Sequence, residues 1–334
     1  STVMFPLLVL ISTKLFFDLF GNQNGRIETN LLLNHKINKK LGTMLMANGA
    51  FVPLKQDMNK DGFLDMPLMK QYNLLNRWNY QGDKLEGQYM IKVLSENRIA
   101  GQTSIHHQQN DSLPLYGINI NTKRVEAFAK TGYIFDDHGD KSLGTQFSGV
   151  YHQQKSTYGL KLFDTKQATF TGTVLYQTNI KDNDNHIIVG GANFVYDKID
   201  EQLDSVQIQR TDIVPGFFAE YTFKWNSKIT LVSGVRGDYH SRAGFQVSPR
   251  IHAKFDLTTT TTLRVAAGSG FRAPNILTEN QSLLASSRNL VFQENPTKEV
   301  AWNYGVSLTQ KFNLFNREGN FSVDFFRTDF TKQA

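Results

Sequence analysis

Cysteine is absent from this chain of 334 residues, which excludes both a disulfide framework and a metal site built from thiolates. Proline is scarce at 8 residues, whereas aromatic residues are plentiful, with 25 Phe and 12 Tyr. A low-complexity disordered chain would not carry so many aromatic residues, and the length is sufficient to bury a large core. The net charge of +6 is modest, and no concentrated basic arm indicates nucleic acid as a partner.

Long hydrophobic runs are also missing. The longest, VMFPLLVLI at 3–11, contains Pro6, and a membrane-spanning helix needs about twenty apolar residues. No basic segment precedes this run and no clear small-residue cleavage site follows it, as a signal peptide would require. We therefore treat 1–13 as an irregular or misbounded N-terminus and 14–334 as the folded part.

The chain does have a strict two-residue alternation. The segment FQVSPRIHAKFDL at 245–257 places apolar residues on one face and polar or charged residues on the other for thirteen positions. Such a pattern predicts a β-strand well above the usual length of about five or six residues. The same pattern recurs at 217–225, 229–239, 300–312 and 27–37.

Breaks marked by Gly, Asn, Asp and Pro divide the chain into about fifteen predicted strands and no convincing helix. We expect the strands near 14–20, 26–37, 40–48, 71–81, 85–97, 124–135, 142–153, 169–180, 186–197, 213–225, 228–240, 245–257, 261–270, 298–312 and 320–331. The fold class is therefore all-β.

The predicted connections alternate in length. Short turns fall at one end of the strands, and nearly all long segments fall at the other, at 52–70, 100–123, 198–212 and 271–297. A transmembrane antiparallel up-and-down β-barrel is built this way, with an apolar face toward lipid and a polar lumen. A polar lumen also explains why the mean hydropathy of −0.37 resembles that of a soluble protein.

A β-sandwich or propeller with one buried face would show the same alternation. Strand length favours the barrel, because tilted membrane strands need about nine to eleven residues. Aromatic residues near strand ends also suit the interfacial girdles of a barrel. They are Trp78, Tyr80, Trp225, Tyr239, Trp302 and Tyr304.

A motif at the end of one strand carries a family resemblance. The segment LRVAAGSGFRAPN, followed by a long loop, ENPTKEVAWNYGVSL and GNFSVDFFRTDF, resembles the barrel of TonB-dependent outer-membrane receptors. The first family motif is matched by Gly270, Phe271, Arg272, Ala273, Pro274 and Asn275, and the second by Asn295, Pro296, Lys298 and Glu299. The segment DMNKDGFLDMPLMKQYNLLNRWNY at 57–80 is similar to an external loop and returning strand of Bacteroidetes-type members.

The resemblance implies ligand-gated import, across the bacterial outer membrane, of a scarce large nutrient such as a siderophore or cobalamin chelate. It implies an N-terminal plug that contacts the TonB complex, in a barrel of about 22 strands surrounded by outer-membrane lipid. This chain has no room for a plug before Lys14 and ends near the fifteenth strand, so we expect an incomplete barrel without its plug. The resemblance implies no enzyme activity and no resident cofactor.

The motif at 268–275 raises two hypotheses. Gly268 and Gly270 lack side chains where the strand meets the barrel rim, and Pro274 fixes the turn. Arg272, with Asn275 beside it, either contacts the plug or an anionic ligand, or forms a structural corner that orders the long loop.

A second motif has the spacing of a calcium loop. Oxygen-bearing side chains stand at alternate positions with a glycine at the sharp turn, in Asp57, Asn59, Asp61, Gly62 and Asp65. The position of the bidentate glutamate of an EF-hand is Leu68, and no helices flank the segment. The segment is therefore either a calcium site in an external loop or a solvated Asp/Asn turn.

The remaining chemistry-bearing residues give no catalytic pattern. His106 and His107 lie in a polar loop and either meet a metal chelate or are solvated. No Ser–His–Asp order, carboxylate pair or phosphate-binding glycine loop is present, and the Gly-x-Gly at 268 opens no helix. A passive porin-like channel and a barrel enzyme remain the alternatives to the receptor.

Overall fold

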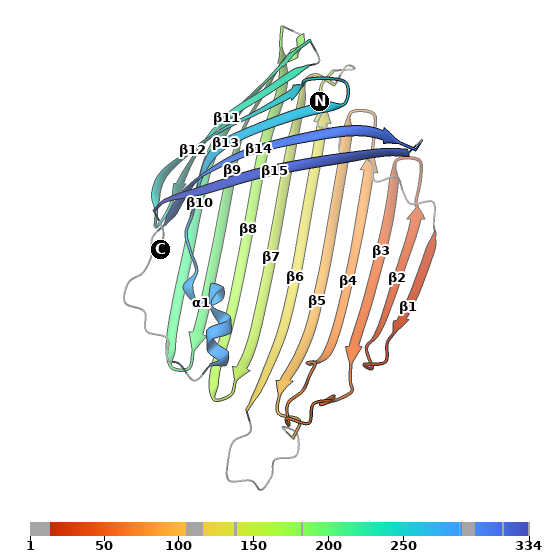
Figure 1. Ribbon diagram of the computed structural model, residues 1–334, viewed down its shortest axis with the longest axis vertical. Helices are drawn as coiled ribbons and strands as arrows, with labels where there is room; N and C mark the ends of the chain where they lie inside the picture. Colours follow the sequence, from red (N-terminus) through yellow and green to blue (C-terminus); the bar gives the residue numbers. More distant parts are fainter. Residues whose placement is uncertain are drawn as a thin grey trace.

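The computed structural model describes residues 14–104, 116–136, 139–181, 183–226, 228–286, 288, 298–315 and 317–332. They form one antiparallel sheet of 15 strands, in which each strand pairs with its neighbours in chain order (Figure 1). The sheet curls so that β14 and β15 cross in front of the central strands (Figure 1). The predicted all-β, up-and-down architecture is confirmed.

The strands follow the predicted order. They are β1 (Leu15–Gly21), β2 (Ile27–Lys36), β3 (Leu41–Val52), β4 (Leu68–Gln81), β5 (Leu85–Gly101), β6 (Gly117–Ile134), β7 (Ser142–Tyr158), β8 (Lys161–Ile180), β9 (Asn183–Leu203), β10 (Val206–Trp225), β11 (Ile229–His240), β12 (Gly244–Asp256), β13 (Thr261–Arg272), β14 (Glu299–Leu314) and β15 (Arg317–Lys332). The edge strands β1 and β15 each pair on one side only among the described residues, so the described sheet is an open wall.

The connections separate into two rims. At the short-turn rim, every connection has at most seven residues, as at 37–40, 82–84 and 135–141. In one such turn, the hydrogen bond from Lys40 Nζ to Asp83 Oδ2, at 2.9 Å, raises the pKa of Lys40. The opposite, long-loop rim carries 53–67, 102–116 and 273–298. The predicted asymmetry between the two ends of the strands is therefore confirmed.

Two predictions about this rim are wrong. Residues 198–212 are not a long loop, because β9 and β10 continue through them and join at the two residues Asp204 and Ser205. The segment after β13 also contains two short helices, α1 (Ile276–Glu279) and the 3-10 helix η1 (Gln281–Ala285), where none was expected. No helix in the described parts of the chain is long and apolar enough to span a bilayer.

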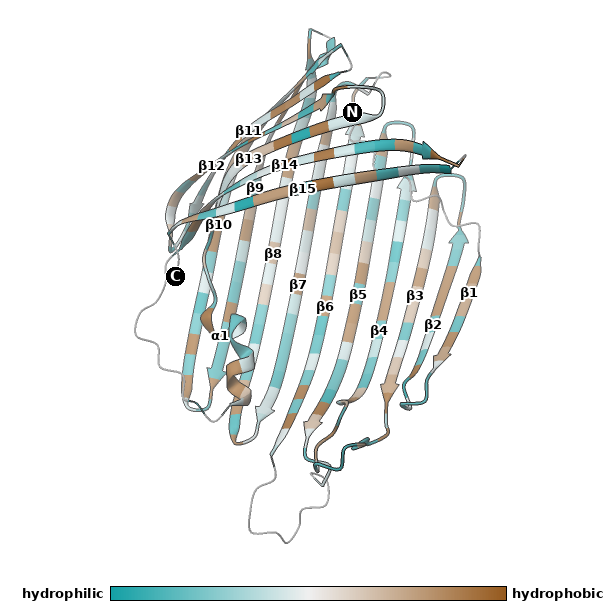
Figure 2. Ribbon diagram, viewed as in Figure 1, coloured by the Kyte–Doolittle hydropathy of each residue, from teal (hydrophilic) through white to brown (hydrophobic). Residues whose placement is uncertain are grey.

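Hydrophobic and hydrophilic residues alternate along many of the strands (Figure 2), and the register places them on opposite faces of the sheet. On β5, the side chains of Tyr89, Ile91 and Val93 are exposed on the outer face. Between them, Lys92 points to the inner face, where its Nζ lies 3.4 Å from Glu126 Oε1 of β6. An apolar outer face and a charged inner face match a wall between lipid and an aqueous lumen.

Near the long-loop rim this polarity reverses. Tyr158 and Phe163 face inward and are 7% and 0% exposed, and they form a buried cluster with Leu277 and Leu284. On the outer face of the same strand ends, Lys155, Asp164 and other residues are polar. Strands β7–β10 are 17 to 21 residues long, beyond the roughly 9–11 residues that cross a membrane. Their ends therefore form a projecting sheet with its own small core.

Candidate functional site on the inner wall

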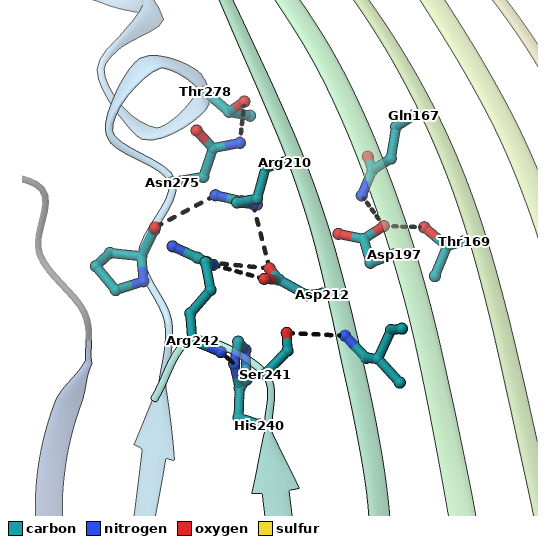
Figure 3. Close-up of polar contacts among 12 residues, drawn as sticks. Gln167, Thr169, Asp197, Arg210, Asp212, His240, Ser241, Arg242, Asn275 and Thr278 are labelled. Atoms are coloured by element: carbon teal, nitrogen blue, oxygen red, sulfur yellow. Dashed lines mark hydrogen bonds and ion pairs between the residues drawn. The ribbon is translucent and has the colours of Figure 1, made fainter. Parts of the chain in front are cut away.

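The charged centre of the inner wall is Asp212 on β10, which is 6% exposed. Its carboxylate accepts hydrogen bonds from Arg242 Nε at 2.5 Å and Arg242 Nη2 at 3.0 Å. Arg210, two residues away on the same face, places its Nε 3.2 Å from Asp212 Oδ2. One carboxylate thus holds two guanidinium groups, one from β10 and one from the β11–β12 turn (Figure 3).

The backbone next to this carboxylate is fixed by a turn. Ser241 donates its backbone N–H to Ile213 O at 3.1 Å and accepts the Ile213 N–H on its hydroxyl, also at 3.1 Å. The Arg242 N–H lies 3.2 Å from His240 Nδ1. The β11–β12 turn is therefore locked onto β10, and this lock aims Arg242 at Asp212 (Figure 3).

The segment 273–286 lies on this wall (Figure 1). Arg210 Nη1 donates to Pro274 O at 3.5 Å. The Asn275 amide and the Thr278 hydroxyl both donate to Glu201 Oε1, at 3.3 and 2.7 Å. Because Glu201 is 4% exposed, two donors compensate the burial of its carboxylate. We call residues 273–286 the inner segment.

Apolar contacts and backbone acceptors hold the other end of the inner segment. Leu277 and Leu284 are 2% and 1% exposed and pack on the Tyr158–Phe163 cluster. The Tyr116 hydroxyl donates to Ala285 O at 2.6 Å. Lys161 Nζ donates to the carbonyls of Ser286 and Arg288, each at 2.6 Å. The inner segment is thus anchored across β6–β8, far along the chain from its own strands.

A cavity of about 320 Å³ lies between the inner segment and the wall. Amides and hydroxyls dominate its lining, with His152, Gln154, Thr165 and Gln167 from the wall and Asn275 and Gln281 from the inner segment. Asp197, also in the lining, accepts hydrogen bonds from Gln167 and Thr169 at 2.8 and 2.6 Å. The cavity offers hydrogen-bonding groups of both kinds to a ligand in the lumen.

Two ion pairs hold Arg272 at the point where β13 leads into the inner segment. Its guanidinium lies 2.7 Å from Glu299 Oε2, its cross-strand partner on β14, and 3.1 Å from Glu279 Oε2 on α1. Glu279 also accepts the Asn275 backbone N–H at 2.9 Å. These pairs favour the structural corner over a free ligand-binding arginine, while contact with a plug or ligand stays a prediction.

The two motif glycines differ. A Cβ on Gly268 would lie 3.2 Å from Arg250 Cβ, whereas a Cβ on Gly270 would meet open space. Pairing between β12 and β13 ends at Arg250–Gly268, next to Pro249, which has no N–H to donate. Beyond this point β13 pairs with β14 alone and leads into the inner segment. Close packing explains Gly268, and nothing in the structure explains Gly270.

The predicted calcium segment is a compact turn in the 53–67 loop. Asp57 accepts the N–H groups of Asp61 and Gly62, each at 3.0 Å, and Gly62 has φ +83°. Asp65 accepts the Met58 N–H at 2.7 Å, and Asn59 donates to Asp61 at 2.9 Å. In the described parts of the chain, no group of three His, Cys, Asp or Glu residues is placed to hold a metal ion. The calcium hypothesis therefore stays a prediction that this geometry does not support.

Sequence analysis identified part of the inner-wall site. Arg272, Asn275, Pro274 and Glu299 lie together, and Phe271 contacts the His240 ring edge-to-face at 6.2 Å between centroids. His106, His107, Asn295 and Pro296 lie outside the described residues. The sequence patterns do not identify Glu201, Asp212, Arg242, Leu277 and Leu284. The first two fall in 198–212, which was predicted as a loop, and the paired leucines of ILTENQSLLA were the available signal for a packed segment.

Comparison with known proteins gives the family. Residues 45–334 match the family described as TonB dependent receptor-like, beta-barrel. The match covers most of the chain, and the chain belongs to this family of outer-membrane receptors. A comparison with curated proteins finds no match.

Solved structures share the fold at low sequence identity. The alcaligin outer-membrane receptor FauA of Bordetella pertussis is 12% identical, with a TM-score of 0.68, and the match covers 94% of this chain and 51% of that one. The hemophore receptor HasR of Serratia marcescens, solved with its hemophore HasA and heme, is 13% identical, with a TM-score of 0.70 and coverages of 96% and 55%. The ferric enterobactin receptor PfeA of Pseudomonas aeruginosa is 11% identical, with a TM-score of 0.69 and coverages of 95% and 52%.

The chain thus spans about half the length of these receptors. The family and its structural neighbours are receptors rather than enzymes, and they place the chain in the outer membrane of a Gram-negative bacterium. The predicted family, fold and location are confirmed. Neither the porin nor the enzyme alternative finds support in these comparisons.

Proposed function

We propose that the chain is the barrel wall of a receptor that imports an iron-bearing chelate. The observation that carries this proposal is the inner segment, which lies on the lumen face and forms a polar cavity with the wall of a TonB-dependent receptor barrel. Three structural neighbours are the alcaligin receptor FauA, the ferric enterobactin receptor PfeA and the hemophore receptor HasR, which was solved with its hemophore HasA and heme. Cobalamin, which the sequence resemblance also implied, is the alternative cargo.

In this proposal the long-loop rim faces the cell exterior. The ligand enters there and meets the inner segment before it passes deeper into the lumen. Energy comes from the TonB complex, which contacts a plug domain as the sequence resemblance implies. The wall contributes binding and orientation, because its polar side chains are already held in place by the Asp212 and Glu201 hydrogen bonds.

Uptake in whole cells tests the proposal. A strain deleted for the gene and its complemented partner are given radiolabelled ferric alcaligin, ferric enterobactin, heme or cobalamin. We expect uptake of an iron-bearing ligand only in the complemented strain, with loss of that uptake when a protonophore removes the energy source. Uptake that persists with the protonophore would indicate a passive channel, and uptake of cobalamin alone would reassign the cargo.

A further inference from the structure

Near the long-loop rim, strand β10 has a sheet edge that no other described strand covers. It pairs with β9 from Val206 onward, but with β11 only from Gly216 onward. The β11–β12 turn reaches slightly further, because the Ser241 N–H donates to Ile213 O and the Ser241 hydroxyl accepts the Ile213 N–H. Beyond this contact, residues 206–212 have β9 on one side and no strand among the described residues on the other. We call 206–212 the open edge.

The antiparallel ladder fixes the direction of the backbone groups on the open edge. Successive residues turn their N–H and C=O groups to alternate sides of a strand, and Ile213 turns both groups toward Ser241, away from β9. The same side is shared by Gln207, Gln209 and Thr211, which are exposed and whose backbone groups bond to no described residue. Donors and acceptors thus recur about every 7 Å along the open edge. Another antiparallel strand satisfies this pattern.

The open edge lacks the usual protection against strand pairing. Natural sheets block an exposed edge with charged side chains, proline or a bulge. The outer-face side chains of this stretch, Gln207, Gln209 and Thr211, carry no charge, and the pairing with β9 has no register shift. Its charged side chains, Arg210 and Asp212, lie on the inner face and are paired with each other. The residues of the open edge therefore permit the addition of a strand.

On the inner face, two guanidinium groups next to the open edge share one carboxylate. Arg210 and Arg242 both pair with Asp212, and their side chains are 17% and 31% exposed. Arg242 lies in the turn that ends the pairing between β10 and β11, so an added strand would begin beside Arg242 and pass Arg210. A carboxylate at the inward position opposite Arg210 would meet both guanidinium groups. The charge on this side therefore favours a partner with an acidic residue there.

The position of the open edge indicates a partner from the aqueous phase. The outer face of β10 changes from the apolar Ile213 to the polar Thr211 and Gln209, so the open edge lies past the apolar surface. A second copy of this chain fits poorly, because copies in one membrane run their β10 strands in the same direction. An antiparallel ladder requires opposite directions, and parallel pairing is slightly less stable.

We propose that the open edge binds an extended segment of a separate soluble protein, which joins the sheet as an antiparallel strand. The segment bonds the outward backbone groups of Gln207, Gln209 and Thr211, and it places an acidic side chain opposite Arg210. In strand addition of this kind, backbone bonds supply affinity and side chains supply specificity. The inference requires that the long-loop rim faces the cell exterior, and it does not depend on which ligand is imported.

Peptide binding and hydrogen exchange on the intact receptor in detergent micelles test the proposal. The probe is a cyclic β-hairpin peptide whose outer strand reads TETVT, with its glutamate opposite Arg210 and its valine opposite Ile208. A second peptide, TKTVT, differs only in that glutamate. The test variant is Gln209→Pro, which removes one outward N–H and keeps the pairing with β9. The matched control, Gln209→Ala, keeps the N–H, and unchanged heat-dependent gel mobility confirms that each variant is folded.

Without peptide, the amides of Gln207, Gln209 and Thr211 should exchange faster than those of Ile208 and Arg210, which face β9. The TETVT peptide should slow the exchange of the three outward amides in the parent. It should bind the Gln209→Ala variant equally well and the Gln209→Pro variant at least about fivefold more weakly, because a backbone hydrogen bond is lost. The TKTVT peptide should bind the parent at least about tenfold more weakly, because close charge pairs across an interface contribute that much.

Three results would overturn the proposal. The first is slow exchange of the three outward amides without peptide, which would show that this chain or a second copy already covers the open edge. The second is no binding of the TETVT peptide to the parent. The third is equal binding of the two peptides, or equal binding of TETVT by the two variants.

Discussion

At the scale of single residues, Asp212 is the charge on which the inner wall depends. Asp212→Asn would leave Arg210 and Arg242 next to each other without their shared carboxylate. We expect a loss of about 2 kcal/mol in the free energy of unfolding, less than the roughly 3–5 kcal/mol for breaking a fully buried pair, because Arg242 is partly exposed. Urea unfolding of the intact receptor in lipid vesicles measures this loss.

The matched control is Asp200→Asn, whose carboxylate is more exposed and lies 3.9 Å from Lys198. An exposed pair contributes little, so this change should cost no more than about 0.5 kcal/mol. If the two variants were equally stable, the Asp212 cluster would not be a structural centre of the wall.

Substitution of Arg272 tests whether this residue forms a structural corner or contacts the ligand. Its side chain is 57% exposed, and exposed ion pairs contribute little, so Arg272→Ala should leave the stability of the whole receptor nearly unchanged. Loss of both ion pairs should, however, release the start of the inner segment, and limited proteolysis within 273–286 should become faster. Arg327→Ala, which removes another exposed ion pair, serves as the control. Weaker ligand binding with unchanged proteolysis would instead make Arg272 a ligand contact.

At the scale of elements, the inner segment is held by two leucines. Leu284 is 1% exposed, and Leu284→Ala should cost about 2–4 kcal/mol of docking free energy because it leaves a cavity in the small core. Hydrogen exchange should show faster exchange of the amides in 276–286, with the strands of the wall unchanged. Leu283→Ala is the control, since Leu283 is 38% exposed. Equal exchange in the two variants would contradict the packing of the inner segment.

The 57–65 turn is a separate element with its own test. If it holds calcium, calorimetry on the intact receptor should show one binding event that Asp61→Ala removes. Asp83→Ala, in a short turn at the opposite rim, should leave that event unchanged. Absence of heat on titration with calcium would leave the segment as a solvated Asp/Asn turn, which its internal hydrogen bonds already stabilise.

Most strands could be predicted from the sequence, because a strict apolar–polar alternation indicates a sheet with one apolar and one polar face. The prediction failed at 198–212, where the faces exchange character. Leu203 points inward there to the small core and Ile199 to the cavity, whereas Lys198 and Gln202 are exposed on the outer face. In this stretch the apolar residues face inward and the polar residues face outward, opposite to the rest of the strand. Among charged residues such a pattern looks like a polar loop unless the segment that packs on it is known. That segment includes Leu277, more than seventy residues away.

The inner-wall site was harder to predict for the same reason. The contacts of Arg210 with Pro274 and of Glu201 with Thr278 join residues 64 and 77 positions apart. The motif at 268–275 correctly marked one side of the site. Nothing local to that motif identifies Glu201 or Asp212 as the other side, because their sequence surroundings are those of any polar strand.

At the scale of the whole molecule, the position of the membrane gives a direct prediction. Ile91 is 50% exposed on the apolar outer face of β5, and Ile91→Lys should reduce the free energy of folding into lipid vesicles by about 2–4 kcal/mol. Ser95→Lys, two outer-face positions further along the same strand, lies where Ser95 and Asn97 replace the apolar residues, and it should be tolerated. Equal costs for the two lysines would move the membrane boundary.

The hairpin of β9 and β10 has a further use. Its strands continue for seven residues past Tyr196, about 20 Å, and end in the two-residue turn Asp204–Ser205. The turn residues are exposed, and below them β9 is paired with both β8 and β10, while β10 pairs with β9 alone as far as Pro215. A peptide spliced in after Ser205 would therefore stand on a stiff stalk, clear of the lipid and outside the transport path. The hairpin is a ready-made site for cell-surface display.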